Sequence, residues 1–258
     1  MKTIWHLSRL YLLGSIRRQA HLATLFMGFI LLMLPAYVNA FSLGLGAFER
    51  VAKDFGLTIV SYFGIVMAIV LGSTSVPRDQ ESRSLHPILA RPISRGAYLL
   101  AHYVSMIVLL GASLFLLACC LLLGVSALTK SVDTSIFLGV WGSYLQCCVI
   151  AAACLLFSTV SSPALAGTVG AAIYLVGSLS EGFITYFLAE DRNSQVAEFT
   201  AKALKSVLPN LTLFQVKDAV VHQLAVPPGY FAALTLYAVT WITVLLMVAN
   251  LIFRKKDL

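Results

Sequence analysis

Long uncharged, largely apolar runs alternate with short polar segments along this chain of 258 residues. The runs occupy residues 22–48, 55–77, 96–123, 134–180 and 230–253. A helix of about 20 residues crosses a bilayer, so four runs hold one crossing each, and the run at 134–180 holds two, separated by a turn at Ser161-Ser162-Pro163. The pattern therefore predicts an all-α integral membrane protein with six transmembrane helices, forming a single domain over residues 1–258.

Composition agrees with this prediction. Hydrophobic residues make up 59% of the chain and charged residues 11%, whereas about 25% of the residues of a soluble domain are charged. The six crossings and the polar segments between them account for nearly the whole length. We therefore expect no separate soluble domain.

Basic residues are distributed unevenly between the polar segments. Eleven of the eighteen Lys and Arg residues lie near the two termini and in residues 77–96, which six crossings place on one side of the membrane. Loops rich in Lys and Arg face the cytoplasm. We therefore expect a multi-pass protein of the cytoplasmic (inner) membrane, with both termini inside and with residues 49–54, 130–133 and 189–229 outside. The net charge of +7 then reflects orientation rather than nucleic-acid binding.

The polar segment at residues 77–96, PRDQESRSLHPILARPISRG, separates the second and third predicted crossings. Its charged residues are Arg78, Asp79, Glu81, Arg83, Arg91 and Arg95. Pro77 is suited to the start of a helix, and Asp79 and Glu81 would then lie in its first turn, where carboxylates complement the helix dipole. Pro87 and Pro92 limit any helix here to short pieces.

Three apolar residues of the same segment, Leu85, Ile88 and Leu89, recur at the spacing i, i+3, i+4. They would form a small apolar knob within a basic surface, which suits a segment that docks into the groove of a cytoplasmic partner. The pattern also suits a solvated loop held by lipid headgroups. Spacing alone does not separate these two interpretations.

Three motifs in and after this segment carry a family resemblance: ESRSL at 81–85, ILARPISR at 88–95 and YLL at 98–100. They resemble the loop between the second and third membrane helices of type-2 ABC exporter permeases. The stretch LPN at 208–210 and the closing FRKKD at 253–257 extend the resemblance over most of the chain. One departure is visible, because Ala101-His102 stands where the family usually has Gly-Lys.

The resemblance implies partners and roles. In that family the loop contains a coupling helix that docks on an ATPase subunit, so the contact residues here would be Asp79, Glu81, Arg83, Leu85, Ile88, Leu89, Arg91 and Arg95. The permease would pair with a second copy or a homologue and with two ABC ATPase subunits. ATP and Mg would bind to those subunits, and this chain itself would bind no cofactor.

The first nineteen residues are basic and amphipathic. Ile4, Trp5 and Leu12 share one side of a helical wheel, and Lys2 and Arg9 lie on the other. This arrangement predicts an interfacial helix over residues 1–19 that rests on membrane lipid. The segment lacks the features of a cleaved signal peptide.

The outer polar region at 189–229 contains two amphipathic stripes on either side of Pro209-Asn210. The stripes are Val196, Phe199, Ala203 and Val207, and Leu213, Val216, Val220 and Leu224. They predict two helices. The resemblance implies short, partly re-entrant helices that close the outer mouth, whereas the pattern equally suits a hairpin resting on the outer leaflet.

Ionisable residues are rare within the predicted crossings, and Glu181 directly follows the apolar run at 134–180. It is a candidate for a functional site, or for a structural carboxylate at the outer headgroup boundary. We take Glu181 and Phe183 as candidates for the substrate path or outer gate. Small residues at Gly167, Gly170 and Ala171 suit close helix packing, either within one subunit or between two.

No metal site, disulfide framework or catalytic cluster is expected. The five cysteines lie within predicted crossings and are interpreted as small apolar residues. The histidines are scattered, and His102 is interpreted as an interfacial residue rather than a ligand. The motif GVSALTKS at 124–131 lacks the second glycine of a phosphate-binding loop, so ATP would have to be bound by a partner.

Two classes of function remain. The first is a permease subunit of an ABC exporter, not itself an enzyme, that moves an apolar or amphiphilic substrate, because the crossings offer few groups to line a hydrated ion path. The second is a membrane-embedded enzyme or assembly factor that acts without ATP. Against an enzyme, the crossings contain no clustered His, Asp or Glu.

Overall fold

The computed structural model describes residues 20–41, 48–81, 95–130, 133–190, 209–221 and 227–254. Six long helices make up most of this part, and two short elements precede the last of them. The long helices are α2 (Ala20–Phe41), α3 (Phe48–Glu81), α5 (Arg95–Thr129), α6 (Ser135–Ser158), α7 (Pro163–Glu190) and α10 (Pro228–Arg254). The short elements are the 3-10 turn η1 (Thr212–Phe214) and α9 (Lys217–Val221). No strand occurs in the described residues, which confirms the all-α fold.

The membrane crossings correspond closely to the predicted runs. Five helices, α2, α3, α5, α6 and α10, are long and apolar enough to span a bilayer. The apolar part of α7, Pro163–Leu179, is shorter. With α7 as the sixth crossing, the helices agree with the expected count.

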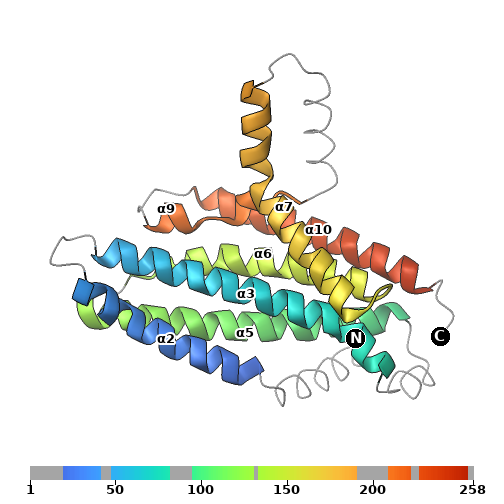
Figure 1. Cartoon of the computed structure of the whole chain (residues 1–258), viewed down its shortest axis with the longest axis horizontal. Coiled ribbons are helices and arrows are strands. Elements are labelled where there is room, and N and C mark those ends of the chain that lie inside the picture. The colour runs from blue at the N-terminus through green and yellow to red at the C-terminus, as the bar shows by residue number, and fades with distance from the viewer. Residues whose placement is uncertain are drawn as a thin grey trace.

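The helices pack lengthwise around α6 (Figure 1). α6 contacts α3, α5, α7 and α10, while α2 packs mainly against α5. The first residues of α3, the last of α5, the first of α6 and helix α9 gather at one end, on the left of Figure 1. The end of α3, the start of α5, the α6–α7 turn and the end of α10 gather at the other.

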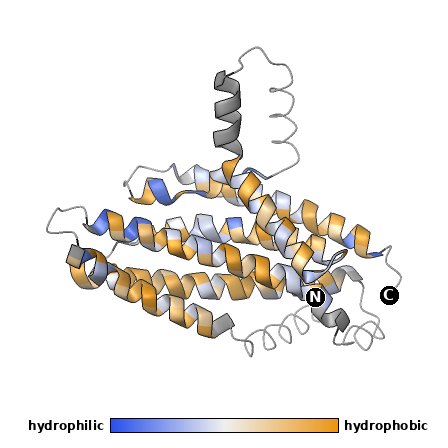
Figure 2. Cartoon of the chain, viewed as in Figure 1, coloured by the Kyte–Doolittle hydropathy of each residue, from blue (hydrophilic) through white to orange (hydrophobic). Residues whose placement is uncertain are grey.

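Hydropathy follows this arrangement (Figure 2). Apolar residues cover the middle of the helices, and hydrophilic residues are concentrated at the start of α3 and in α9. Large apolar side chains such as Phe26, Phe115 and Met247 are exposed by 61 to 68%. Exposed apolar surface on this scale is expected of a protein whose outer faces contact lipid.

Small residues allow α6 to lie deep in the bundle. A Cβ added at Gly72 of α3 would lie 2.5 Å from Cβ of Cys154, and one at Gly170 of α7 would lie 2.1 Å from its Sγ. Cys147, Cys148 and Cys154 are buried and not bonded to one another, as expected of small apolar residues. Gly170 of α7 therefore serves packing within the subunit.

Two predicted boundaries were wrong. Residues 49–54, expected as a loop, form the first turns of α3, where Glu49 complements the dipole at the helix start. Pro77, expected to begin a helix, lies inside α3, which continues to Glu81. Proline lacks the N–H for the backbone hydrogen bond to residue i−4, and its ring crowds that residue's carbonyl, and α3 continues for only one more turn beyond it.

The outer segment differs from the single amphipathic helix predicted after Pro209-Asn210. The chain forms η1 and α9, with Gln215 between them at φ −79° and ψ 66°, outside the helical region. Val216 and Val220 are buried as expected, but Phe214 is buried in place of Leu213, which is 37% exposed. A Cβ at Gly142 of α6 would lie 2.6 Å from the Phe214 carbonyl oxygen, so the glycine allows the turn to rest on α6.

Other predictions lie outside the described residues. These are the interfacial helix at 1–19, most of the segment at 77–96, the first outer stripe at 196–207, and Leu224.

Candidate functional site

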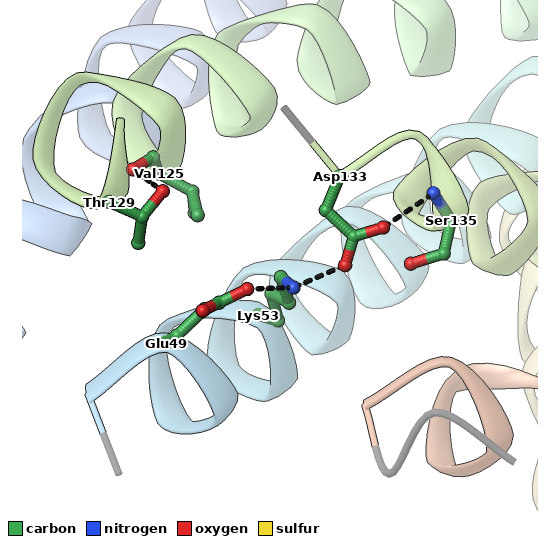
Figure 3. Close-up of polar contacts among 6 residues, drawn as sticks. All are labelled: Glu49, Lys53, Val125, Thr129, Asp133 and Ser135. Carbon is green, nitrogen blue, oxygen red and sulfur yellow. Dashed lines mark hydrogen bonds and ion pairs between the residues drawn. The ribbon is translucent and has the colours of Figure 1, made fainter. Parts of the chain in front are cut away.

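A buried ammonium group marks the charged end of the bundle. Lys53, one turn after Glu49 in α3, has a side chain that is only 2% exposed. Its Nζ donates hydrogen bonds to Oε1 of Glu49 and to Oδ2 of Asp133, which precedes α6 (Figure 3). The two carboxylates neutralise the buried cation and join the start of α3 to the start of α6.

Asp133 is held in turn by the start of α6. Its Oδ1 accepts a hydrogen bond from the backbone N–H of Ser135 at 3.0 Å. Partial burial would raise the pKa of Asp133, but hydrogen bonds from Lys53 and Ser135 and the Lys53 charge outweigh it and lower the pKa to about 2. Asp133 is therefore ionised at every physiological pH.

A second lysine ties the outer segment to α3. Lys217, the first residue of α9, donates from Nζ to Oγ1 of Thr58 at 3.1 Å and lies 3.6 Å from Oδ1 of Asp54. The backbone N–H of Asn210 donates to the Tyr237 hydroxyl of α10 at 2.8 Å. Residues from three segments that the sequence places outside thus meet at one end of the bundle.

A small polar pocket of about 100 Å³ lies beneath this segment. Its polar walls include Ser61 and Tyr62 of α3, Gln146 of α6, Tyr174 of α7 and Lys217 of α9. Gln146 is 2% exposed, and its Nε2 has no hydrogen-bond partner within the described part of the chain. An unpaired buried donor costs about 1–3 kcal/mol, so this pocket stands out in an otherwise apolar bundle.

A larger groove, of about 360 Å³, lies between α5 and α6. Leu114, Phe115, Phe137 and Trp141 line it. The indole N–H of Trp141 donates to Oγ1 of Thr235 in α10 at 3.4 Å. The lining of this groove is mostly apolar, so the groove suits a hydrocarbon chain rather than a polar ligand.

Three of the residues predicted for partner contact, Asp79, Glu81 and Arg95, lie on helices that meet at the opposite end. Asp79 and Glu81 occupy the last turn of α3, rather than the first turn of a new helix, and Arg95 is the first residue of α5. The remaining predicted contact residues, Arg83, Leu85, Ile88, Leu89 and Arg91, lie outside the described residues. The structure brings the two ends of this segment to the same end of the bundle (Figure 1).

The two residues proposed for the substrate path or outer gate, Glu181 and Phe183, belong to the last part of α7. Their side chains lie outside the described part of the structure. The backbone alone therefore shows only that both continue the helix that begins at Pro163.

His102, which the sequence suggested as an interfacial residue rather than a ligand, is buried in the bundle at 5% exposure. Its ring meets Tyr98 edge-on with 4.8 Å between centroids, and Tyr98 stacks on Phe253 of α10 at 5.8 Å. Within the described residues, no group of three His, Cys, Asp or Glu is placed to hold a metal ion.

A family model described as ABC-2 family transporter protein matches residues 16–258. The chain belongs to the ABC-2 transporter family. No curated relative matches it at a significant level. Membership agrees with the resemblance carried by the 77–96 segment and identifies the helical bundle of this ABC-2 permease as the membrane part of a transporter.

Sequence reasoning assigned no site to three polar residues of this ABC-2 permease. Lys53 has one available signal, the i, i+4 spacing from Glu49, but nothing in the sequence pairs it with Asp133. Gln146 lies within an apolar run and carries no pattern. Lys217 lies within a predicted amphipathic helix, where a lysine is ordinary.

Proposed function

We infer that this ABC-2 permease is the membrane-spanning subunit of an exporter driven by ATP. The family match over residues 16–258 is the observation that carries this inference. In this proposal two separate ABC ATPase subunits bind ATP and Mg and hydrolyse the nucleotide, while the chain pairs with a second copy or a homologue. ATP-driven closure of the ATPases would move the helices of the permease.

The continuity of α3 supports a mechanical role for the segment at 77–96. This helix runs without interruption from Phe48 to Glu81, so it joins the segment to the Lys53 ion cluster at the far end. Its close packing on α6, at Gly72 against Cys154, lets the two helices move together. A displacement at the ATPase side would therefore reach the outer end as a rigid-body movement.

The proposed cargo is apolar or amphiphilic. Uncharged side chains dominate the described crossings, and the charged residues gather at the helix ends. Glu181 and Phe183 remain candidates for the outer part of the path. An ATP-independent membrane enzyme or assembly factor is the competing function.

Affinity purification tests the proposed function directly. The permease, tagged and extracted from its native membrane in mild detergent, should retain an ATPase containing a G-x-x-x-x-G-K-S/T loop in a one-to-one ratio. The purified complex should hydrolyse ATP. A permease that purifies without any ATPase, yet remains folded and active in its cell, would support the competing function instead.

Orientation is tested with two exposed residues at opposite ends of α6. Thr134 precedes the helix and Ser162 follows it, and both are exposed. Since Thr134 is proposed to lie outside and Ser162 inside, Thr134→Cys should react with an impermeant maleimide in intact cells, whereas Ser162→Cys should react only after permeabilisation. The wild-type chain is the background control. Labelling of both variants from one side would contradict the six-crossing topology.

A further inference from the structure

The polar pocket beneath the outer segment is lined by one cation and by amide and hydroxyl groups that can donate hydrogen bonds. Gln146 offers two N–H groups, Lys217 an ammonium, and Ser61, Tyr62 and Tyr174 hydroxyls. No carboxylate is among its lining residues. Lys217 lies 3.6 Å from Asp54, and the side chains of Lys217 and Asp54 are partly exposed, at 33% and 47%. The wall therefore favours a ligand that supplies acceptor oxygens and negative charge.

Gln146 supplies a second, independent observation. It is 2% exposed and lines the pocket, and its Nε2 has no partner among the described residues. The hydroxyl of neighbouring Ser143 donates its hydrogen bond to the carbonyl oxygen of Gly139 at 3.2 Å rather than to Gln146. The Gln146 amide nitrogen therefore keeps uncommitted N–H groups at the wall of the pocket.

The size of the pocket limits the group that fits. Its volume is about 100 Å³, and a cavity of about 150 Å³ accommodates a six-carbon ring. A carboxylate with one or two methylene groups fits, whereas a phosphodiester headgroup with its glycerol does not. The ligand must therefore place a compact anionic head inside and the rest of its mass elsewhere.

An apolar face adjoins the pocket. Tyr62 lines the pocket and is also 57% exposed, and Val66, one turn further along α3, is 59% exposed. Tyr62 meets Tyr174 of α7 edge-on, with 6.5 Å between the ring centroids. A hydrocarbon chain leaving the pocket past Tyr62 would lie along this face of α3.

We propose that the Gln146 pocket binds the carboxylate head of a single-chain amphiphile whose tail lies along the exposed face of α3. Gln146 Nε2 and the pocket hydroxyls donate to the carboxylate oxygens, and Lys217 supplies the countercharge. The claim that exported cargo occupies this pocket rests on the proposed function. The claim that the pocket binds such an amphiphile depends only on the structure of the permease.

A photo-crosslinking experiment on the permease without ATPase subunits tests this site. The probe is dodecanoate with a mid-chain diazirine, added to the permease in phosphatidylcholine nanodiscs, and the readout is the labelled peptide. Labelling should saturate and should map to the α3 peptide containing Tyr62 and Val66. Unlabelled dodecanoate should compete, whereas butyrate and dodecyltrimethylammonium should not.

Two variants and one matched control locate the head group. Gln146→Leu and Lys217→Met should each weaken the apparent affinity at least tenfold. Asn250→Leu is the control, because Asn250 also carries an unpaired buried amide atom, its Oδ1, but lies at the far end of the bundle against Gly96. Its affinity for the probe should equal that of the wild type. Size-exclusion profiles establish that all three variants are folded.

Each contrary result is decisive. If labelling does not saturate, dodecanoate has no specific site and the pocket holds water only. If folded Gln146→Leu is labelled as strongly as the wild type, the carboxylate head binds elsewhere. Competition by butyrate would assign the site to free carboxylates, and competition by dodecyltrimethylammonium would remove the role of charge. If labelling is specific but the permease with its ATPase does not export dodecanoate when ATP is supplied, the binding site is established. Only its role in transport is then overturned.

Discussion

Neutralising Glu49 and Asp133 together should destabilise the permease by about 3 kcal/mol, because the buried ammonium of Lys53 then has no negative partner. The Lys53 side chain is 2% exposed, whereas Glu49 and Asp133 are 38% and 25% exposed, so the partly solvated acids bring the cost to the low end of the range for a broken buried pair. The Glu49→Gln/Asp133→Asn variant should therefore unfold at lower denaturant concentration. Equilibrium unfolding in detergent micelles measures the change.

Adding Lys53→Met to that variant is the matched control. Methionine fills similar space without charge, so the triple variant should recover most of the lost stability. Each single acid variant should cost less than the double, since one carboxylate remains. Equal stability of the double and triple variants would contradict the view that a stranded charge is the cause.

The pH dependence of the wild type follows from the same cluster. The pKa of Asp133 falls to about 2 from an ordinary value of 3.8, so its contribution to stability is complete above about pH 4 and is lost as the pH falls towards 2. Between pH 5 and pH 8 we expect no change in stability from Asp133.

Replacing Leu89 by Asp should abolish coupling to the ATPase while leaving the permease inserted. If the Leu85, Ile88 and Leu89 knob is buried against an ATPase subunit, a charge at its centre costs a few kcal/mol of binding free energy, which weakens association more than a hundredfold. Co-purified ATPase and ATP hydrolysis by the complex are the two measurements.

Ser82→Asp is the matched control for that variant. It adds the same charge to the same segment, at a position outside the apolar spacing, so it should retain the ATPase. Wild-type association in Leu89→Asp would contradict the coupling role. Equal loss in both variants would point to general sensitivity to negative charge in a basic segment rather than to a buried apolar knob.

The periodic and compositional features of this chain were readable without its structure. Uncharged runs of about 20 residues have few alternatives to membrane helices, because an unpaired backbone group in hydrocarbon costs several kcal/mol. The tight turn at Ser161-Ser162-Pro163 and the helix at Pro228–Arg254 were confirmed for that reason. The motifs at 81–100 indicated the family that the match over residues 16–258 then showed.

Boundaries were less predictable where charges stand next to apolar runs. Residues 49–54 read as a loop because charge usually marks the end of a crossing, but Glu49 and Lys53 are four residues apart and stabilise a helix start. Pro77 was predicted to begin a helix because proline suits a first helical position and Asp79 and Glu81 would follow in the first turn. At the start of α3 the helix extends past the apolar run because Lys53 pairs with Glu49 and Asp133, contacts that hydropathy does not describe.

The polar pairs were decided by tertiary structure alone. Lys53 and Asp133 are 80 positions apart in the sequence, and Lys217 and Thr58 are 159 apart, and no local pattern brings such residues together. Gln146 has an unpaired amide only because α6 lies at the centre of the bundle with the outer segment above it. Sequence determined that this chain crosses the membrane as helices, since burial of apolar length is a local requirement. Which polar groups those helices bury, and against what, depended on how they pack.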